Sequence, residues 1–288
     1  MNIRNMAQSD AQQVIDLHLR AFREYYSDNV PRTEQNILAC LALNPSGCFV
    51  AEENGKLAGY IFSRKLGKLG WIGSFGVDTD CRSKGVGKTL LERAYSDLDK
   101  KCEIIGLETF SDSSYNMGLY LKQGFRMIAP MLPLSKTGLS LSPAAPELRA
   151  IDAESVSRIC KKLLRGIDYG AEARNALEFG WGAPLSAGDS GFCITRLCAD
   201  KAGKHIHANP LVCRSGGLLP FVKALENYTL AQGAQKIIIP LHSTQHSALK
   251  LLLDNGYKIT KNRVRMVKKG CYGGFPAIDA SHWGMVRG

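Results

Sequence analysis

Signatures of several large protein classes are missing from this chain of 288 residues. No apolar run approaches the roughly 18 residues that a membrane-spanning helix needs, and the start of the chain, Met1 to Arg4, has no apolar core of a secretion signal. The nine cysteines form no CxxC pair, and the closest two are Cys193 and Cys198. We therefore expect no membrane segment, no disulfide framework, no metal site, and reduced thiols in a cytoplasmic protein.

Two common nucleotide-binding motifs are missing as well. The chain has no Gly-x-x-x-x-Gly-Lys-Ser/Thr loop, and it has no Gly-x-Gly-x-x-Gly followed by an acidic residue about 20 positions later. It also lacks a helix-turn-helix pattern and the interleaved aromatic and basic residues of RNA-binding proteins. Nucleic acid is therefore an unlikely partner on sequence grounds.

The charge is uneven along a chain that is long enough for two domains. The 37 Lys and Arg exceed the 26 Asp and Glu, for a net charge of +11. Residues 1–145 hold 17 basic and 15 acidic side chains, whereas residues 146–288 hold 20 and 11. The basic excess of the second half indicates either a solvated surface or a surface that attracts an anionic partner or acceptor.

The most informative segment is 77–88, where a short apolar run ends in Arg82-Ser-Lys-Gly-Val-Gly-Lys88 and a helical pattern follows. The first N–H groups of a helix have no partner within the helix, and the helix dipole is positive there. Glycines let the backbone approach a phosphate closely. Alone, this pattern fits either an anion cradle or a plain turn before a helix.

A second motif, Asn116-x-x-x-Tyr120-x-x-x-Gly124-Phe125, follows after a β-rich run and a short helical pattern. With both motifs in this order, residues 1–130 resemble the GNAT superfamily of acyl-CoA-dependent N-acetyltransferases. One departure is Thr79, which stands where that family often has proline.

The resemblance implies acetyl-CoA as co-substrate, no metal, and direct attack of an amine on the acetyl thioester. Backbone N–H groups at Phe75 to Val77 would face the acetyl carbonyl, the loop would hold the pyrophosphate, and Asn116 would contact the pantetheine arm. The implied cofactor-binding residues are Phe75, Val77, Arg82, Ser83, Lys84, Gly85, Val86, Gly87, Lys88 and Asn116.

Tyr120 is the candidate general acid, because an unperturbed tyrosine of pKa about 10 stays protonated at neutral pH. Its alternative role is a buried ring on an amphipathic helix. For a base, the run 71–77 offers no carboxylate or histidine, so Glu108 in the apolar run 104–110 is the best candidate. Glu108 can instead be an outward strand residue or a structural ion-pair partner, and a water relay also stays open. Glu24, Tyr25 and Tyr26 are candidates for lining the acceptor pocket.

The patterning predicts an α/β fold, a mixed sheet with flanking helices. Helices are expected near 10–26, 33–43, 85–101 and 113–123, and strands near 48–53, 57–65, 69–78, 103–110 and 125–131.

The chain also repeats itself. Gly256-Tyr257 lies 132 residues after Gly124-Phe125, and at the same offset Arg214 aligns with Arg82 without a gap. This predicts two tandem GNAT-like domains, at 1–131 and 147–288, joined by a Pro- and Ser-rich linker at 132–146. At the offset, Leu219, Pro220, Ala248 and Leu252 replace Gly87, Lys88, Asn116 and Tyr120, so a degenerate second copy is expected.

Three further patterns lie in the second half. Lys261, Arg263 and Arg265 alternate along one strand face, either solvated or lining an anion site. His205 and His207 also alternate, without a third ligand at metal spacing, so a structural role is expected. The aromatic, glycine-rich tail at 270–283 is predicted to fold over a cleft.

The sequence thus predicts a cytoplasmic N-acetyltransferase that moves an acetyl group from acetyl-CoA to a primary amine in its first domain. The acceptor would be a small molecule or a protein amine, and the basic second half favours one with negative charge. The alternative is a non-catalytic, acyl-CoA-responsive binding protein whose basic second domain engages an anionic partner. The oligomeric state is not predicted.

Overall fold

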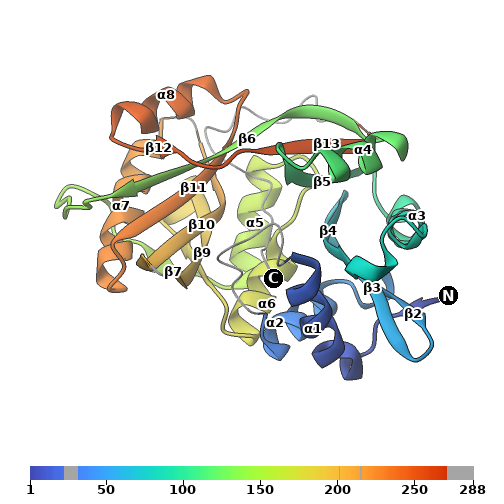
Figure 1. Ribbon diagram of the computed structural model, residues 1–288. Helices are drawn as coiled ribbons and strands as arrows, with labels where there is room; N and C mark the ends of the chain where they lie inside the picture. The colour runs from blue at the N-terminus through green and yellow to red at the C-terminus, as the bar shows by residue number, and fades with distance from the viewer. Residues whose placement is uncertain (23–31, 201, 215, 271–288) are drawn as a thin grey trace.

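The computed structural model describes residues 1–22, 32–200, 202–214 and 216–270 (Figure 1). The first half contains β1 (Asn2–Asn5), α1 (Ala11–Phe22), α2 (Glu34–Leu43), β2 (Phe49–Glu53), β3 (Lys56–Leu66), β4 (Leu69–Val77), α3 (Val86–Asp99), β5 (Ile104–Phe110), α4 (Ser114–Lys122) and β6 (Arg126–Thr137). The second half contains β7 (Arg149–Ala150), α5 (Ala153–Leu163), α6 (Gly170–Glu178), β8 (Ala183–Ser186), β9 (Gly191–Asp200), β10 (Gly203–Cys213), α7 (Leu218–Ala231), β11 (Lys236–His242), α8 (His246–Asp254), β12 (Lys258–Ile259) and β13 (Arg263–Lys269). No helix in these ranges combines the length and apolarity needed to cross a membrane.

Local sequence explains where several helices begin. Thr33 precedes α2, and its side chain accepts a hydrogen bond from the backbone N–H of Asn36, which satisfies an orphan donor of the first turn. Asp152 caps α5 in the same way, through Ser155. Gly85 precedes α3 with φ +82°, a left-handed conformation that only glycine adopts at low cost.

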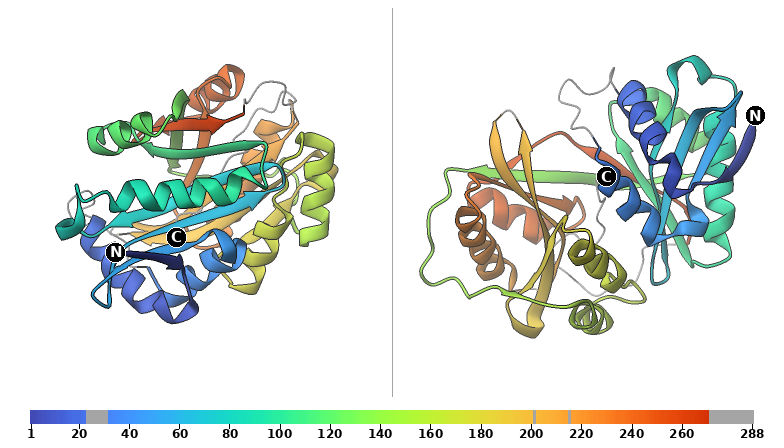
Figure 2. Two further views of the ribbon diagram at one scale, coloured as in Figure 1. Left: turned by 90° about the vertical axis from the view of Figure 1, so that its right-hand side faces the viewer. Right: turned by 90° about the horizontal axis from the view of Figure 1, so that it is seen from below.

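The strands form one continuous mixed sheet in the order β1-β2-β3-β4-β5-β13-β6-β11-β10-β9-β8-β7, with β12 paired to β6. Helices pack against it in both halves, and the view from below in Figure 2 shows the two halves side by side, with β6 extending between them. The predicted mixed sheet with flanking helices is therefore confirmed.

The two halves are related by an approximate two-fold rotation. Met127 of β6 pairs with Met266 of β13, and the residues 132 positions away from these two, Ile259 and Leu134, pair with each other. Such reciprocal pairing is the mark of a two-fold contact between like units. The repeat that the sequence predicted is therefore present in the backbone.

The axis passes between Met131 and Arg263, which pair with each other and lie 132 positions apart. As a result, the halves exchange strands. β13, from the end of the chain, lies between β5 and β6 and completes the first half's part of the sheet. The second part of β6 pairs with β11 and β12 and completes the second half's part of the sheet.

The strand exchange corrects the expected domain boundaries. The predicted linker at 132–146 is wrong in its first part, because β6 continues without interruption to Thr137. The predicted domain at 147–288 likewise contains β13, a strand of the first half's sheet. The two copies are therefore interlocked, and the connecting segment without strand or helix begins only after Thr137.

The gap-free alignment of Arg214 with Arg82 also needs correction. Eight residues, 78–85, separate β4 from α3, whereas four residues, 214–217, separate β10 from α7. Upstream of this loop, corresponding residues of the two halves lie 136 positions apart instead of 132. Trp71 pairs with Gly106 on the neighbouring strand, and the corresponding pair in the second half is His207 with Ile238. The second copy therefore has a shorter loop at the position of the predicted phosphate cradle.

The halves meet in a shared apolar core. Leu66, Leu69 and Trp71 of the first half pack against residues of α5 and α6 from the second. Burying one such side chain contributes about 1.5–3 kcal/mol, so this contact holds the halves together strongly. Separate cores lie under α3 and α4 of the first half and under α7 and α8 of the second.

Most predicted elements agree with the structure to within two residues at each end. The first helix ends at Phe22 among the described residues, so the expected extension through 23–26 lies outside them. Strand β1 was not predicted, and β6 is longer than expected. The tail beyond Gly270 also lies outside the described residues.

Candidate functional site

The site is built where two parallel strands separate. β4 pairs with β5 only from Leu69 to Ile72, opposite Ile104 to Leu107, although both strands continue further. Beyond Ile72 the described residues show no pairing between these strands. The end of β4 at Phe75–Val77 therefore turns a backbone edge toward the opening, as the sequence analysis required for an oxyanion donor.

The loop after β4 has the backbone geometry that the predicted anion cradle requires. Ser83 and Gly85 have φ values of +63° and +82°, and left-handed residues of this kind turn successive N–H groups toward a common concavity. The N–H of Thr89 donates the first bond of the helix, to the carbonyl of Gly85. The N–H groups of α3 that precede Thr89 are therefore directed at the loop and not at a helical carbonyl.

Gly87 brings three elements of the site together. A Cβ atom at this position would lie 3.0 Å from Cζ of Phe75, 3.4 Å from Cγ2 of Val77 and 3.8 Å from Cδ2 of Leu119. The start of α3, the end of β4 and the middle of α4 thus converge on one glycine. The two motifs found in the sequence are neighbours in space.

The loop is also fastened to α1. Nη2 of Arg82 donates a 3.0 Å hydrogen bond to the carbonyl of Ala21, and Arg20 forms a 2.8 Å ion pair with Asp78. Ser83, Lys84 and Gly85, by contrast, are exposed at the tip. Arg82 therefore shapes the cradle, while Lys84 and the exposed N–H groups are accessible to an anion.

Helix α4 places the two candidate polar residues one turn apart. Tyr120 is 7% exposed, and its ring packs edge to face on Phe125 with centroids 5.9 Å apart. Asn116 is half-buried on the same side of the helix. The buried-ring role foreseen for Tyr120 is thus present in the structure, and its role as an acid remains a prediction.

Glu108 is held in a buried ion pair. Arg265 of β13 donates to one carboxylate oxygen of Glu108 at 2.6 and 3.0 Å, and both side chains are almost inaccessible. The expectation of Glu108 as base is therefore corrected in favour of the structural ion pair that was its alternative. A carboxylate already neutralised by a guanidinium and shielded from solvent is poorly placed to take a proton from a substrate.

Two residues of the predicted basic face, Arg263 and Arg265, are not solvated. Arg265 lies 5.4 Å from the Trp71 ring centroid, and Arg263 lies 5.3 Å from that of Phe110. Both arginines are buried in the exchanged strand β13. Lys261 lies before this strand, is exposed, and pairs with Asp112 at 2.9 Å.

A polar pair that the sequence analysis did not identify lies against β4. Nδ1 of His18 is 2.7 Å from the hydroxyl of Tyr60, which in turn is 3.5 Å from Oγ of Ser74. Burial, with the charge of Arg32, lowers the pKa of His18 to about 3. A Cβ atom at Gly76 would lie 2.7 Å from the Tyr60 ring, so the pair borders the β4 edge. The only sequence signal was a histidine on an apolar helix face.

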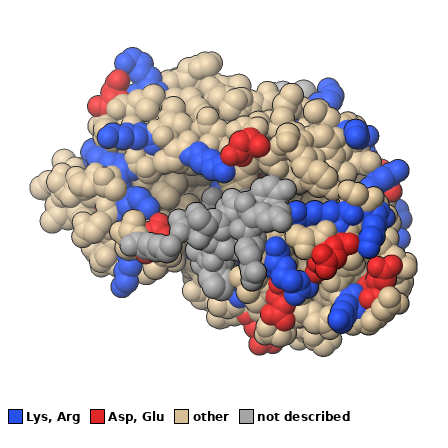
Figure 3. All heavy atoms as spheres, viewed as in Figure 1, with Lys and Arg blue, Asp and Glu red and all other residues tan. Residues whose placement is uncertain are grey.

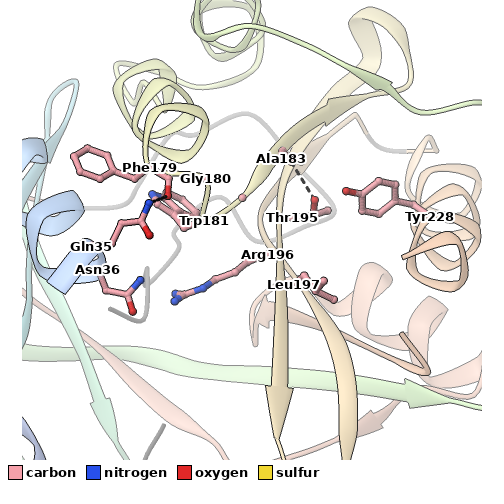
Figure 4. A pocket seen from close by; sticks show the side chains of 11 residues that line it. Gln35, Asn36, Phe179, Gly180, Trp181, Ala183, Thr195, Arg196, Leu197 and Tyr228 are labelled. Carbon is pink, nitrogen blue, oxygen red and sulfur yellow. Dashed lines mark hydrogen bonds between the residues drawn. The ribbon is translucent and has the colours of Figure 1, made fainter. Parts of the chain in front are cut away.

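A separate cleft of about 480 Å³ opens between the halves. Figure 4 shows Arg196 of β9 pointing toward Asn36 of α2. The residues that line the cleft are Gln35, Asn36, Phe179, Gly180, Trp181, Gly182, Ala183, Thr195, Arg196, Leu197 and Tyr228. None of the residues predicted from the sequence lies among them.

The two-fold relation explains the polar character of this cleft. In the strand register, Arg196 of β9 lies opposite His207 of β10, and Arg64 of β3 lies opposite Trp71 of β4. The two arginines therefore occupy equivalent positions in the two halves. Arg64 makes a buried 2.9 Å ion pair with Glu172, the third residue after Tyr169 at the start of α6. The corresponding third residue of α2 is Asn36, an amide. Of these two equivalent contacts between the halves, one is therefore closed by an ion pair and the other leaves a cleft.

Charge is spread over the face shown in Figure 3. Lys and Arg side chains appear over both halves, with acidic side chains between them, and they do not gather into one patch. This face therefore offers no single basic surface of the kind that a nucleic acid would require.

Comparison with known proteins indicates the class. Residues 11–125 match the model of the acetyltransferase (GNAT) family. N-alpha-acetyltransferase 30 from Dictyostelium discoideum is 35% identical over 89 residues, which are 29% of this chain and 48% of that protein. The chain thus matches about half the length of that relative.

Two solved structures match nearly the whole chain. A putative acetyltransferase from Pyrococcus horikoshii superposes with a TM-score of 0.76 at 20% identity, covering 97% of this chain and 93% of its own. A tandem GNAT protein from the clavulanic acid biosynthesis pathway superposes with a TM-score of 0.60 at 13% identity, covering 95% and 99%. At these identities the likeness concerns the fold alone, and it agrees with the two-fold repeat of the backbone.

Proposed function

We propose that the protein is an N-acetyltransferase that moves the acetyl group of acetyl-CoA to a primary amine, and that the first copy carries the reaction. The main support is the convergence at Gly87 of the phosphate loop, the open end of β4 and helix α4. The matched family and the relative named as an N-acetyltransferase support the same reaction class.

The cradle suits a pyrophosphate in both shape and charge. The N–H groups from Ser83 to Lys88 would hold it, with Lys84 adding charge, and Gly87 leaves room where a side chain would press on Phe75. Acetyl-CoA would supply an activated thioester. The backbone of Phe75–Val77 would donate to its carbonyl as negative charge develops there, and Asn116 would bind the arm that leads to it.

Tyr120 would donate a proton to the departing thiolate. It lies on α4 directly after Leu119, which approaches Gly87, and the pairing with Phe125 fixes its ring. With Glu108 bound to Arg265, the proton of the amine would leave through water. His18 borders the same strand edge, but a pKa of about 3 keeps it neutral and suits it to positioning.

The second copy would not bind acetyl-CoA. Its loop is four residues shorter, and Leu252 and Ala248, which replace Tyr120 and Asn116, are fully buried in the core of that half. A buried leucine offers neither a proton nor a hydrogen bond. We therefore expect one acyl-CoA site per chain.

The acceptor would carry a primary amine, on a small molecule or on a protein. The second half's basic excess favours acceptors with negative charge elsewhere in the molecule. The rival proposal, a non-catalytic acyl-CoA-responsive binding protein, has one observation in its favour: the ion pair that occupies Glu108 removes the best carboxylate base.

A calorimetric titration with acetyl-CoA, followed by a transfer assay with a panel of amines, separates these proposals. One site per chain and formation of acetylated amine would support the enzyme. Two sites would contradict the degenerate second copy. Binding without transfer to any amine would favour the rival, and no binding would refute both.

A further inference from the structure

The β9–β10 hairpin gathers three metal-binding side chains on one face. His205 pairs directly with Cys198 across the two strands, and His207 pairs with Arg196. Directly opposed residues share a face of an antiparallel pair, and so do residues two positions apart. Cys198, His205 and His207 are therefore neighbours, although the sequence analysis assigned the two histidines a structural role for want of a third ligand.

We propose that Cys198, His205 and His207 bind a zinc ion. One ligand atom from each residue lies within 4.8 Å of those of the other two. Zinc bonds of about 2.0–2.3 Å in a tetrahedron require the three atoms to approach somewhat more closely. Small rotations of the side chains suffice, because the backbone already holds them on adjacent positions.

A carboxylate supports the site. Oδ2 of Asp200 lies 3.5 Å from Nδ1 of His205, which is an ion-pair distance without a hydrogen bond, and it accepts a 3.1 Å hydrogen bond from Lys236. A small rotation of the imidazole would let Nδ1 donate to this carboxylate and leave the other nitrogen for a metal. His205 is buried, whereas Cys198 and His207 are half-buried. An ion could therefore enter the site, and a water molecule could serve as its fourth ligand.

The two-fold relation shows that the fold itself does not require these residues. The hairpin positions of Cys198, His205 and His207 correspond to those of Leu66, Leu69 and Trp71 in the first half. There the three side chains belong to the apolar core between the halves. The second half thus has three metal-binding side chains at positions where the first half has apolar core residues.

The donor set selects the class of ion. A thiolate and two imidazoles suit zinc and similar divalent transition metals, and they are poor ligands for magnesium or calcium. Three protein ligands with one open position are typical of zinc sites that accept water or a small ligand. The neighbouring Arg196 lines the cleft of Figure 4, so an anionic group reaching the fourth position would meet a cation there.

The test uses the full-length chain, stripped with a chelator under reducing conditions and titrated with Zn²⁺ against a chromophoric chelator. Co²⁺ in a parallel titration reports the ligands directly. We expect one equivalent per chain, a near-ultraviolet band from thiolate-to-cobalt charge transfer, and the intense visible bands of a tetrahedral ion. Asp200→Asn should weaken binding by about 10- to 100-fold, and Cys198→Ser should weaken it more and abolish the charge-transfer band.

Matched controls are Cys40→Ser, a half-buried cysteine of α2, and His246→Gln, an exposed histidine. Both should bind as the unaltered chain does. The absence of a charge-transfer band in the unaltered protein would overturn the proposal without any variant. So would a band that persists in Cys198→Ser or disappears in Cys40→Ser. If Cys198→Ser does not fold, the titrations of His207→Gln, which should bind more weakly, and of the unaltered chain still test the proposal.

Discussion

Individual buried polar residues control the pH response of this protein. His18 is buried beside Tyr60, and burial lowers its pKa from 6.5 to about 3. The folded chain therefore holds the imidazole neutral, while the unfolded chain takes up a proton once the pH falls below about 6.5. The stability that His18 contributes is complete above that pH and is lost as the pH falls toward 3.

Acidification should thus destabilise the fold through His18. Each pKa unit corresponds to about 1.4 kcal/mol, so the free energy of unfolding should fall by on the order of 2–3 kcal/mol between pH 6.5 and 4.5 from this group alone. His18→Gln should reduce the slope of that part of the profile, as measured by urea denaturation at a series of pH values. Part of the remaining slope belongs to His242, because burial lowers its pKa to about 4. His246→Gln, at an exposed site, should leave the slope unchanged. An equal slope in His18→Gln would contradict the assignment.

Tyr120 is the residue on which the proposed chemistry depends. Tyr120→Phe keeps the ring against Phe125 and removes only the hydroxyl. If that hydroxyl protonates the thiolate, kcat should fall by about 100-fold or more, while the Kd for acetyl-CoA from calorimetry stays within about twofold of the original.

The control is Tyr115→Phe, on the same helix but largely exposed. It should change neither quantity. An unchanged kcat in Tyr120→Phe would show that the tyrosine is only a packing residue.

Among the elements, the β4–α3 loop distinguishes the two copies. Its eight residues include two left-handed positions and a tether to α1, whereas four residues make the same connection between β10 and α7. The helices that follow, α3 and α7, have the same length of 14 residues. The scaffold therefore tolerates either loop, and the longer one is the loop that we propose binds acetyl-CoA.

Replacing residues 78–85 with the four residues found at 214–217 should abolish acetyl-CoA binding in calorimetry. The thermal midpoint should change little, since the short connection already exists in the second copy. Lys84→Gln keeps the loop and removes one exposed charge, so it should weaken binding only modestly. Full affinity in the loop replacement would mean that the cradle lies elsewhere.

At the scale of the whole molecule, strand exchange makes the two copies one folding unit. β13 supplies a central strand of the first sheet, with Met266 and Val267 fully buried. The cluster around Trp71 adds an apolar contact between the halves. Neither half has a complete sheet by itself, and the cores under α3 and α7 each include a residue of the other half, Met266 and Leu134 respectively.

Calorimetric unfolding should therefore show a single transition whose van't Hoff and calorimetric enthalpies agree. The fragment 1–146 should not fold cooperatively, because β5 and β6 would lose the strand between them. Two separate transitions, or a stable fragment 1–146, would show that the exchanged strand is not essential to the first half.

The sequence by itself determined the local features of this protein: the phosphate loop, the Asn116 and Tyr120 motif, most helices and strands, and the repeat. These depend on spacing and residue type within short windows, where backbone geometry follows directly from glycine, helix periodicity and strand alternation. The order of the two motifs was enough to indicate the family.

Only the tertiary structure decided which distant residues meet. Glu108 was the candidate base in the sequence, and the structure shows that Arg265 of β13 forms an ion pair with it. Cys198 lies beside the histidines because of the register between β9 and β10. The strand exchange was equally hidden, because a strand's own sequence specifies its pairing face but not its partner. Partners are chosen by the packing of the whole sheet, and for this reason the end of β6, the ion pair at Glu108 and the proximity of Cys198 to the histidines appear only in the tertiary structure.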